Sequence, residues 1–435
     1  MSNNVVYLHG KPREIALTTR VGFSEHRLCE QLLSANKLTS RRFVLEAATA
    51  NTPRHKSLLR SSKDSKSEVI LDTNCAELSV SGRFSGAARS APWAVDGRPL
   101  DAEDFVAGTN RSVIEPIARF AVSSDVTAIL SPAHFLGDRN LDWLSIDLES
   151  CAALRKSLDS LGGAHIPIDY PIIATYAQLR DPTFRKAMID GISNSPIDRV
   201  WLRISGFGAD ATGVGISRLV EAIRDFHSLG VPIIADHVGG IASLALPALG
   251  AVSGFATGIE GKQRFNAGDW LKPAGTGGGG GSKRIFISGL DRSFLIEEMR
   301  QFFDETRTAR QLFGCSDPAC CGDIDKMLRN PAAHLAVQTS KAVSELSDAP
   351  ETLRSKHFLD RYLSESVKYA RRATGIKNMT AELRKKIEAS AKKLELTKEA
   401  LSGLHEREGN WEFPPEARFR IGSRQTELNF QEKSS

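Results

Sequence analysis

The sequence lacks the features of a secreted or membrane-bound protein. None of its 435 residues belongs to an apolar run of the about 20 residues that a transmembrane helix needs. The first residues, Met1–Asn4, do not lead from a basic segment into an apolar one, as a secretory signal would. Six cysteines are too few for a disulfide framework in a chain of this length. We therefore expect a cytoplasmic protein whose cysteines are reduced.

Two motifs that define familiar enzyme classes are also missing. No Gly-x-Gly-x-x-Gly follows the first apolar run, which counts against a dinucleotide-binding sheet. No His-x-His ends an early apolar run, which counts against a metal-dependent barrel hydrolase. The net charge of +5 is compatible with a phosphate-rich partner but does not require one.

Short apolar runs alternate with longer amphipathic stretches, a pattern typical of parallel strands covered by helices. Eight such runs are 15–19, 43–48, 69–72, 126–131, 172–175, 200–204, 231–235 and 252–255, and a ninth is 285–288. Helices are predicted over Pro182–Ile192 and over Ile216–Leu229, which ends at Gly230. About eight such units close into an α/β fold, the (β/α)8 barrel of TIM type. An open doubly wound sheet is the alternative.

The pattern divides the chain into a barrel domain (residues 1–290), a metal-binding helical subdomain (291–375) and an amphipathic helix with a polar tail (376–435). The helix, Thr380–Leu404, carries leucine and isoleucine on one face and needs a partner surface, which is the chain's own barrel, a second protein or a second copy. From Glu406 onward we expect a poorly ordered tail.

Two segments of the barrel domain read as loops. Residues 51–66 are polar and basic, and we expect a solvated loop there, with a phosphate-contacting arm as the alternative. Residues 275–281 are almost all glycine and predict a flexible loop or a lid.

Active sites of such barrels lie at the carboxyl ends of the strands, and several polar residues and glycines fall there. Asp72 and Asp236 are the catalytic candidates, because a partly shielded carboxylate at a strand end can act as a base or a nucleophile. The alternative is that each caps a helix or pairs with an arginine. The substrate-binding candidates are His134, Arg203, Gly206, Gly208, Gly239 and Gly240.

Three of the six cysteines and a histidine lie close together in the sequence after the barrel domain. Cys315, Cys320, Cys321 and His334 make a set of four ligands for a structural Zn²⁺ ion. His334 follows Asn330-Pro331, which predicts a helix start. The alternative is a group of reduced, buried or reactive thiols.

A barrel followed by a three-cysteine, one-histidine zinc site and helices resembles the tRNA-guanine transglycosylases and their DNA-acting relatives, over roughly residues 69–346. The resemblance implies exchange of a guanine in nucleic acid for a 7-deazaguanine-type base, by an aspartate nucleophile and a second aspartate as general acid/base. It places Asp72 at the family's first aspartate and residues 203–208 on the glycine-containing strand that lines the base pocket. It implies tRNA or DNA as the partner and Zn²⁺ as the cofactor.

One position departs from the family pattern. Alanine, Ala256, stands where the family has its nucleophile, so another carboxylate must serve, with Asp236 and Glu260 nearest. Three functions stay open: a base-exchanging enzyme, whose basic residues Arg54, Lys56, Lys262 and Arg264 hold phosphates; a non-catalytic binding subunit that has lost the nucleophile; and a metal-dependent barrel hydrolase that uses His134, His237, Asp72 and Asp291.

Overall fold

Eight parallel strands close into a barrel at the centre of the computed structural model, which describes residues 12–80, 90–124, 126–137, 142–272, 283–409 and 411–421. The strands are β1 (Ala16–Arg20), β2 (Arg42–Glu46), β3 (Glu68–Asp72), β4 (Ala128–Leu130), β5 (Ile168–Thr175), β6 (Arg199–Ser205), β8 (Ile233–Asp236) and β9 (Gly254–Gly258). They pair in the order β5-β4-β3-β2-β1-β9-β8-β6, and β5 pairs with β6 to close the ring. The predicted TIM-type barrel is confirmed, and each of the eight predicted runs overlaps one of its strands.

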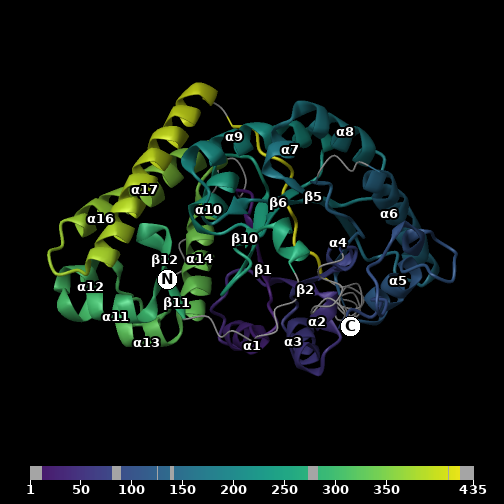
Figure 1. Cartoon of the computed structure of the whole chain (residues 1–435), viewed down its shortest axis with the longest axis horizontal. Helices are drawn as coiled ribbons and strands as arrows, with labels where there is room; N and C mark the ends of the chain where they lie inside the picture. The colour runs from purple at the N-terminus through teal and green to yellow at the C-terminus, as the bar shows by residue number, and fades with distance from the viewer. Residues whose placement is uncertain are drawn as a thin grey trace, which may run out of the picture.

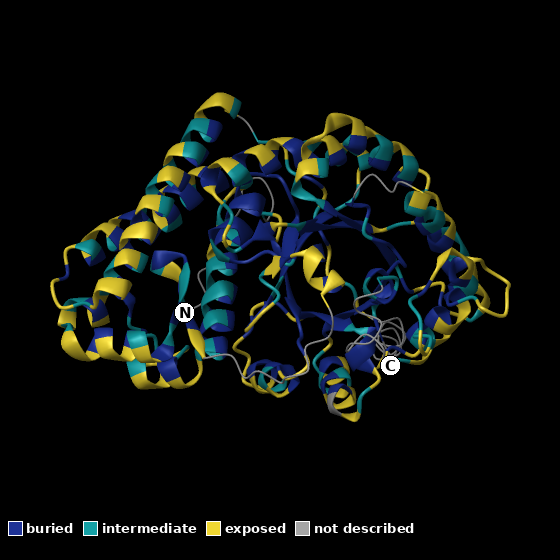
Figure 2. Cartoon of the chain, viewed as in Figure 1, coloured by how far each residue is buried: buried dark blue, intermediate teal, exposed yellow. Residues whose placement is uncertain are grey.

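The barrel interior has charged ends and an apolar middle. Because alternate residues of a strand face the same side, Glu68, Ile70 and Asp72 of β3 all point inward, from the amino end to the carboxyl end. Ile70 packs in an apolar cluster with Val44 of the neighbouring β2 and with Trp201 of β6, which lies across the barrel. Figure 2 shows the strands as a continuous buried ring.

Helices surround the barrel, as Figure 1 shows. They are α1 (His26–Ser34), α2 (Ala47–Ala50), α3 (Pro53–Asp64), α4 (Cys75–Leu78), α5 (Ile114–Ser123), α6 (Asp142–Ser160), α7 (Tyr176–Arg180), α8 (Pro182–Ile192), α9 (Gly213–Ile223) and α10 (Gly240–Ala248). The predicted helix over Pro182–Ile192 is α8, and the one over Ile216–Leu229 is α9 with a 3-10 turn that ends at Gly230 in the left-handed conformation.

The loop predicted for residues 51–66 is wrong, because α3 occupies most of it. Pro53 stands at the first position of the helix, where a missing N–H costs nothing. Leu58 and His55 are fully buried, so the helix has an inner face despite its basic composition. The glycine tract 275–281 lies outside the described residues.

A helical extension follows the barrel and lies beside it in Figure 1. The ninth apolar run is β11 (Arg284–Ile287), which pairs with β12 (Arg292–Leu295) in a separate hairpin rather than in the barrel. The helices after it are α11 (Ile296–Glu305), α12 (Arg307–Phe313), α13 (Ile324–Arg329), α14 (Pro331–Asp348), α15 (Glu351–His357), α16 (Ser364–Thr374) and α17 (Ala381–Glu408). No helix among the described residues is both long and apolar enough to cross a bilayer.

The chain itself covers the apolar face of α17. Leu383, Ile387, Leu394, Leu401 and Leu404 are all buried, and the helix packs on α16 and α9. This face is therefore occupied within the chain and does not offer its leucines to another protein.

The tail after α17 docks on the amino end of the barrel, so the expectation of a poorly ordered segment is wrong for residues 411–421. Arg420 donates to Glu68 and, with two nitrogens, to Asp169, over 2.7 and 2.8 Å. Ala417 enters the apolar cluster of the barrel interior. Arg199 and Arg42 of the barrel strands also pair with Glu68, so the tail adds a further cation to this buried cluster and supplies the arginine that pairs with Asp169.

Candidate functional site

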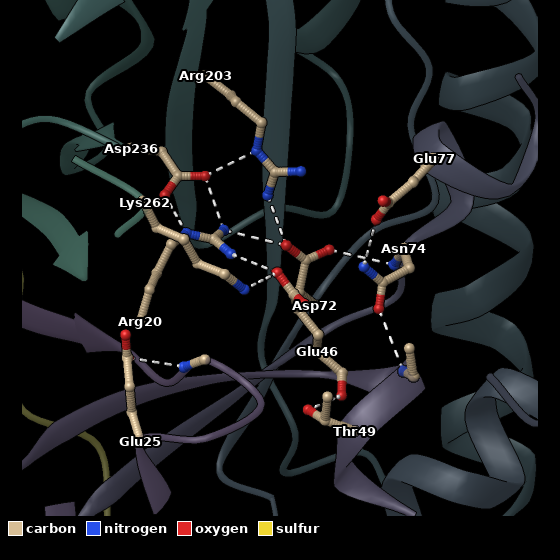
Figure 3. A network of polar contacts seen from close by, with 12 residues as sticks. Arg20, Glu25, Glu46, Thr49, Asp72, Asn74, Glu77, Arg203, Asp236 and Lys262 are labelled. Carbon is tan, nitrogen blue, oxygen red and sulfur yellow. Dashed lines mark hydrogen bonds and ion pairs between the residues drawn. The ribbon is translucent and has the colours of Figure 1, made fainter. Parts of the chain in front are cut away.

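Two aspartates and two arginines form a closed ion-pair network, the Arg–Asp quartet, at the carboxyl end of the barrel (Figure 3). Arg20 ends β1, Asp72 ends β3, Arg203 lies on β6 and Asp236 ends β8. Arg20 reaches Asp236 over 2.5 and 2.7 Å and Asp72 over 3.0 Å. Arg203 bridges the same two carboxylates over 2.8 and 2.6 Å. The structure thus brings three predicted residues, Asp72, Asp236 and Arg203, into one network.

All four side chains of the quartet are buried, and their charges balance. Burial alone would raise the pKa of Asp72, but Arg203 and Arg20 outweigh it and hold the pKa well below its usual range. Burial likewise opposes ionisation of Asp236, and Arg20 and Arg203 again lower its pKa. Both carboxylates are therefore ionised near neutral pH, and neither can donate a proton while the arginines hold it.

A second, more accessible ion pair lies next to the quartet. Glu46 ends β2 in register with Asp72 and bonds Lys262, which follows β9. About a quarter of each of these side chains is exposed, and Arg20 lies 4.0 Å from Glu46. Figure 3 shows this pair beside the quartet. Glu46 is thus the carboxylate of this network with the best access to solvent.

Strained backbone accumulates at the same end of the barrel. Asn74, His237 and Lys262 are non-glycine residues in the left-handed region, with φ of 55°, 58° and 56°. They follow β3, β8 and β9, beside Asp72, Asp236 and Glu46 respectively. Such conformations cost of order 1–3 kcal/mol each and gather at functional sites, which supports this end as the working end of the barrel.

His134 lies apart from the quartet, in a pocket of its own. Its Nδ1 atom is 2.5 Å from Asp147 and its Nε2 atom 2.9 Å from Ser79. Its ring stacks on Trp143 at 3.7 Å. Both ring nitrogens have partners within the chain, so the geometry gives His134 a packing role rather than a ligand contact.

Most of the glycines predicted to bind substrate are required by the backbone conformation or by close neighbours within the chain, and do not line an open ligand site. Gly240 begins α10 with φ of 61°, and a Cβ there would lie 2.6 Å from the carboxylate of Asp291. That carboxylate accepts from the N–H of Ile241 and bonds Lys393, so a side chain of the chain already fills the anion-binding start of this helix.

Gly208 and Gly239 are also closed by the chain itself, whereas Gly206 has open space beside it. Gly208 pairs with Arg264 in the short β7 (Phe207–Gly208) and β10 (Arg264–Phe265) ladder, which leaves no room for a Cβ. A Cβ at Gly239 would meet the side chain of Gln263. Gly206 has φ of 86°, which only glycine adopts easily, and open space beside it.

The basic residues predicted to hold phosphates are partly engaged elsewhere. Lys262 bonds Glu46, and Arg264 bonds Asp210 over 2.6 Å. Lys56 lies exposed on α3. The side chain of Arg54 lies outside the described residues.

The three cysteines and the histidine predicted as metal ligands come together after β12. One ligand atom from each of Cys315, Cys320, Cys321 and His334 lies within 4.8 Å of the others. The two adjacent sulfurs are 3.5 Å apart, and they lie 3.5 and 3.4 Å from Nδ1 of His334. In a tetrahedral site with sulfur about 2.3 Å and nitrogen about 2.0 Å from the ion, these separations are about 3.8 and about 3.5 Å. Cys320, Cys321 and His334 thus have the spacing of ligands to one tetrahedral ion, and Cys315 lies close enough to be the fourth ligand.

Local structure explains how neighbouring cysteines share one centre. The N–H groups of Cys320 and Gly322 both donate to the carbonyl of Asp317, and Gly322 has φ of 77°, so the chain turns tightly there. His334 lies on the first turn of α14, as predicted. Burial lowers the pKa of His334 to about 4, which leaves the imidazole in the neutral form that binds metals.

A cavity of about 550 Å³ lies between the outer face of the barrel and the extension. Leu17 of β1 and Thr257 of β9 line one side, and Cys315 and His334 of the metal cluster line the other. The cavity lies outside the barrel, and the quartet does not line it.

Sequence reasoning missed Arg20 and Glu46. Arg20 directly follows the predicted strand run 15–19, and Glu46 lies within the run 43–48. Both are polar residues at or near a strand end, which is the feature that identified Asp72. Arg20 was overlooked because a lone arginine after a strand usually faces solvent, whereas here it is 1% exposed.

The chain resembles known proteins in fold alone. No model of a known protein family matches it, and no curated protein matches its sequence. Among solved structures, it is similar to endo-1,4-beta-xylanase XylE from Penicillium canescens (12% identity, TM-score 0.38), covering 56% of this chain and 81% of the xylanase. It is also similar to KGPDC from Streptococcus mutans (13% identity, 60% and 95% coverage, TM-score 0.33). A third is type I 3-dehydroquinate dehydratase from Clostridium difficile (9% identity, 62% and 93% coverage, TM-score 0.35).

Proposed function

We propose that this chain is a divergent transglycosylase-like protein that exchanges a guanine in nucleic acid for a 7-deazaguanine-type base at the carboxyl end of its barrel. The observation that carries the proposal is the combination of two features in one chain. Asp72 and Asp236 share one buried network at that end, and a cluster of three cysteines and a histidine that could hold a metal ion follows the last barrel strand. Zn²⁺ is the ion that three thiolates and an imidazole select for a structural site.

Asp236 takes the role of nucleophile in this proposal. It lies in register with Ala256 on the neighbouring strand, so its carboxylate stands beside the position where the resemblance places the nucleophile. The low pKa keeps it ionised, as attack on the sugar carbon requires. The bond to guanine breaks as the new carboxylate–sugar bond forms, and the leaving guanine takes a proton from Asp72. The incoming base then displaces Asp236 and returns a proton to Asp72.

Asp72 is the general acid/base in this proposal, and the quartet sets a condition on that role. While Arg20 and Arg203 hold it ionised, Asp72 can accept a proton but has none to donate. Substrate entry must therefore separate Asp72 from at least one arginine, so that Asp72 takes up a proton from water and can pass it to the leaving base.

A second candidate is a binding subunit without exchange activity. It is favoured by the full occupation of the quartet: both oxygens of Asp236 accept from arginine, and those of Asp72 accept from the arginines and from the N–H of Asn74. The hydrolase alternative loses support, because His134 bonds Asp147 and Asp291 caps α10 instead of joining Asp72.

The test is incorporation of labelled guanine into tRNA and into duplex DNA by the purified full chain. We expect incorporation by the wild type, none by Asp236→Asn or Asp72→Asn, and retained nucleic-acid binding by both. Asp147→Asn is the matched control, because it also removes a buried paired carboxylate but lies outside the quartet, and it keeps its activity per folded molecule. Binding without incorporation by the wild type would establish the second candidate, and full activity of Asp236→Asn would refute the assigned nucleophile.

A further inference from the structure

The positive charge of the chain is concentrated on one pair of helices. Residues 364–393, which cover α16, the turn after it and the first half of α17, contain nine Lys and Arg and three Glu. That local excess of +6 exceeds the +5 of the whole chain, so the remaining residues together are slightly acidic. An ordinary solvated surface mixes both signs in similar numbers, whereas here the cations outnumber the anions three to one.

Four of these cations are exposed and have no ion pair among the described residues. They are Arg372, Lys377, Lys385 and Lys392. Lys385 and Lys392 are seven residues apart on α17 and so lie on one face, about 10 Å apart along the axis. Two of the three glutamates pair locally, Glu365 with Lys368 and Glu382 with Lys386. The third, Glu388, is exposed within one helical turn of both Lys385 and Lys392 and has no ion pair among the described residues. The four cations therefore keep an excess of three positive charges for an outside partner.

The helices that carry these cations are rigidly held and adjoin the working end of the barrel. Buried leucines fix α17 on α9 and α16. Lys393, next to Lys392, bonds Asp291 and the carbonyl of Ala209, which lies just after β7. The helix that carries Lys392 thus borders the carboxyl end of the barrel, at the edge of the molecule in Figure 1.

We infer that this face, Arg372, Lys377, Lys385 and Lys392, binds the phosphate backbone of a nucleic acid and presents it to the barrel. The inference rests on the proposed function for the identity of the partner and names the surface that would hold it. A lipid surface is disfavoured, because a membrane-bound helix needs an apolar face and that of α17 is buried within the chain. Contacts of lysine and arginine with phosphates are independent of sequence and release counterions.

The test compares the full chain with Lys385→Glu/Lys392→Glu, titrated onto fluorescent tRNA and duplex DNA at several salt concentrations. Each phosphate contact adds about 0.9 to the slope of log affinity against log salt concentration for duplex DNA. At 0.1 M salt, compared with 1 M, each contact therefore raises the affinity by a factor of about 8. We expect the double variant to lower the slope by about 2 and the affinity by about 60-fold. Lys156→Glu/Lys186→Glu changes the charge equally on α6 and α8, across the barrel, and should bind like the wild type.

The outcomes separate the surface from the reaction. Wild-type binding and slope in Lys385→Glu/Lys392→Glu would overturn the inferred surface even if the chain incorporates guanine. Loss of binding in that variant alone supports the surface even if the wild type incorporates nothing, which would refute only the exchange reaction. Binding of the wild type to phosphatidylserine vesicles but to neither nucleic acid would overturn the inference.

Discussion

The Arg–Asp quartet makes a quantitative prediction about stability, because its charges balance only as a set. Asp236→Asn keeps the shape of the side chain but leaves Arg20 and Arg203 with one carboxylate, Asp72. Asp236 accepts three short hydrogen bonds from these arginines, and all the groups are buried. Removing one partner of such a buried pair costs about 3–5 kcal/mol. That is a large part of the about 5–15 kcal/mol by which folded proteins are stable.

A second substitution should recover much of this loss. Arg20→Met alone leaves two buried carboxylates against Arg203 and is destabilising for the same reason. In Arg20→Met/Asp236→Asn, Arg203 and Asp72 remain as a balanced pair, which they form directly over 2.6 Å. We expect the double variant to lose about 2–3 kcal/mol less than the sum of the single losses.

The assay is urea unfolding at pH 7, followed by circular dichroism and by the fluorescence of tryptophans that include the buried Trp201. The exposed pair Lys186–Asp190 on α8, at 2.8 Å, is the control, and its Lys186→Met/Asp190→Asn cycle should give only about 0.3–0.5 kcal/mol. Additive losses in the quartet cycle would refute the view that its charges are held as a balanced set.

Three further predictions concern the effect of acid on the quartet, the metal content of the Cys/His cluster and the docking of the tail. Folding lowers the pKa values of Asp72 and Asp236, so their stabilising effect is complete above about pH 4, the unfolded pKa, and is lost as the pH falls through the folded values. Below about pH 4, the free energy of unfolding of Asp236→Asn should therefore fall less steeply with pH than that of the wild type. Mass spectrometry under native conditions should find one zinc ion per chain, and Cys321→Ser should lose it and unfold at lower urea, whereas an unchanged metal content would remove Cys321 from the site. Arg420→Met should cost about 1–3 kcal/mol in urea unfolding, because Asp169 loses its arginine, whereas Glu68 keeps Arg199 and Arg42; no measurable cost would show that the tail docks without stabilising the barrel.

The barrel was predictable from sequence because each strand is buried on both faces. That burial requires short, nearly continuous apolar runs, such as 200–204 in β6, and these stand out from the longer amphipathic helices. The ninth run, 285–288, looks the same locally, yet it pairs with β12, because pairing in space decides which runs share a sheet.

The candidate site was predictable only in part. Asp72, Asp236 and Arg203 could be identified from their positions at or near strand ends, and the metal ligands from their crowding. That Arg20 would tie both carboxylates together depends on barrel closure, which places β1 near β8 although Arg20 and Asp236 are 216 residues apart in sequence. The docking of the tail was missed for a similar reason, since a polar segment finds buried partners only once Glu68 and Asp169 have been brought together.

The docked tail also bears on how the protein is made. Arg13, just before β1, donates to the carbonyls of Phe413 and Pro414, and Arg13 and Phe413 are 400 residues apart. The last barrel strand, β9, ends at Gly258, 162 residues before Arg420. At roughly 5–20 residues per second, a ribosome needs about 8–32 s to deliver the tail once the barrel strands are complete. During that interval the charged amino end of the barrel, with Glu68 inside it, lacks the tail, and the nascent barrel stays unsealed at this end until the tail emerges.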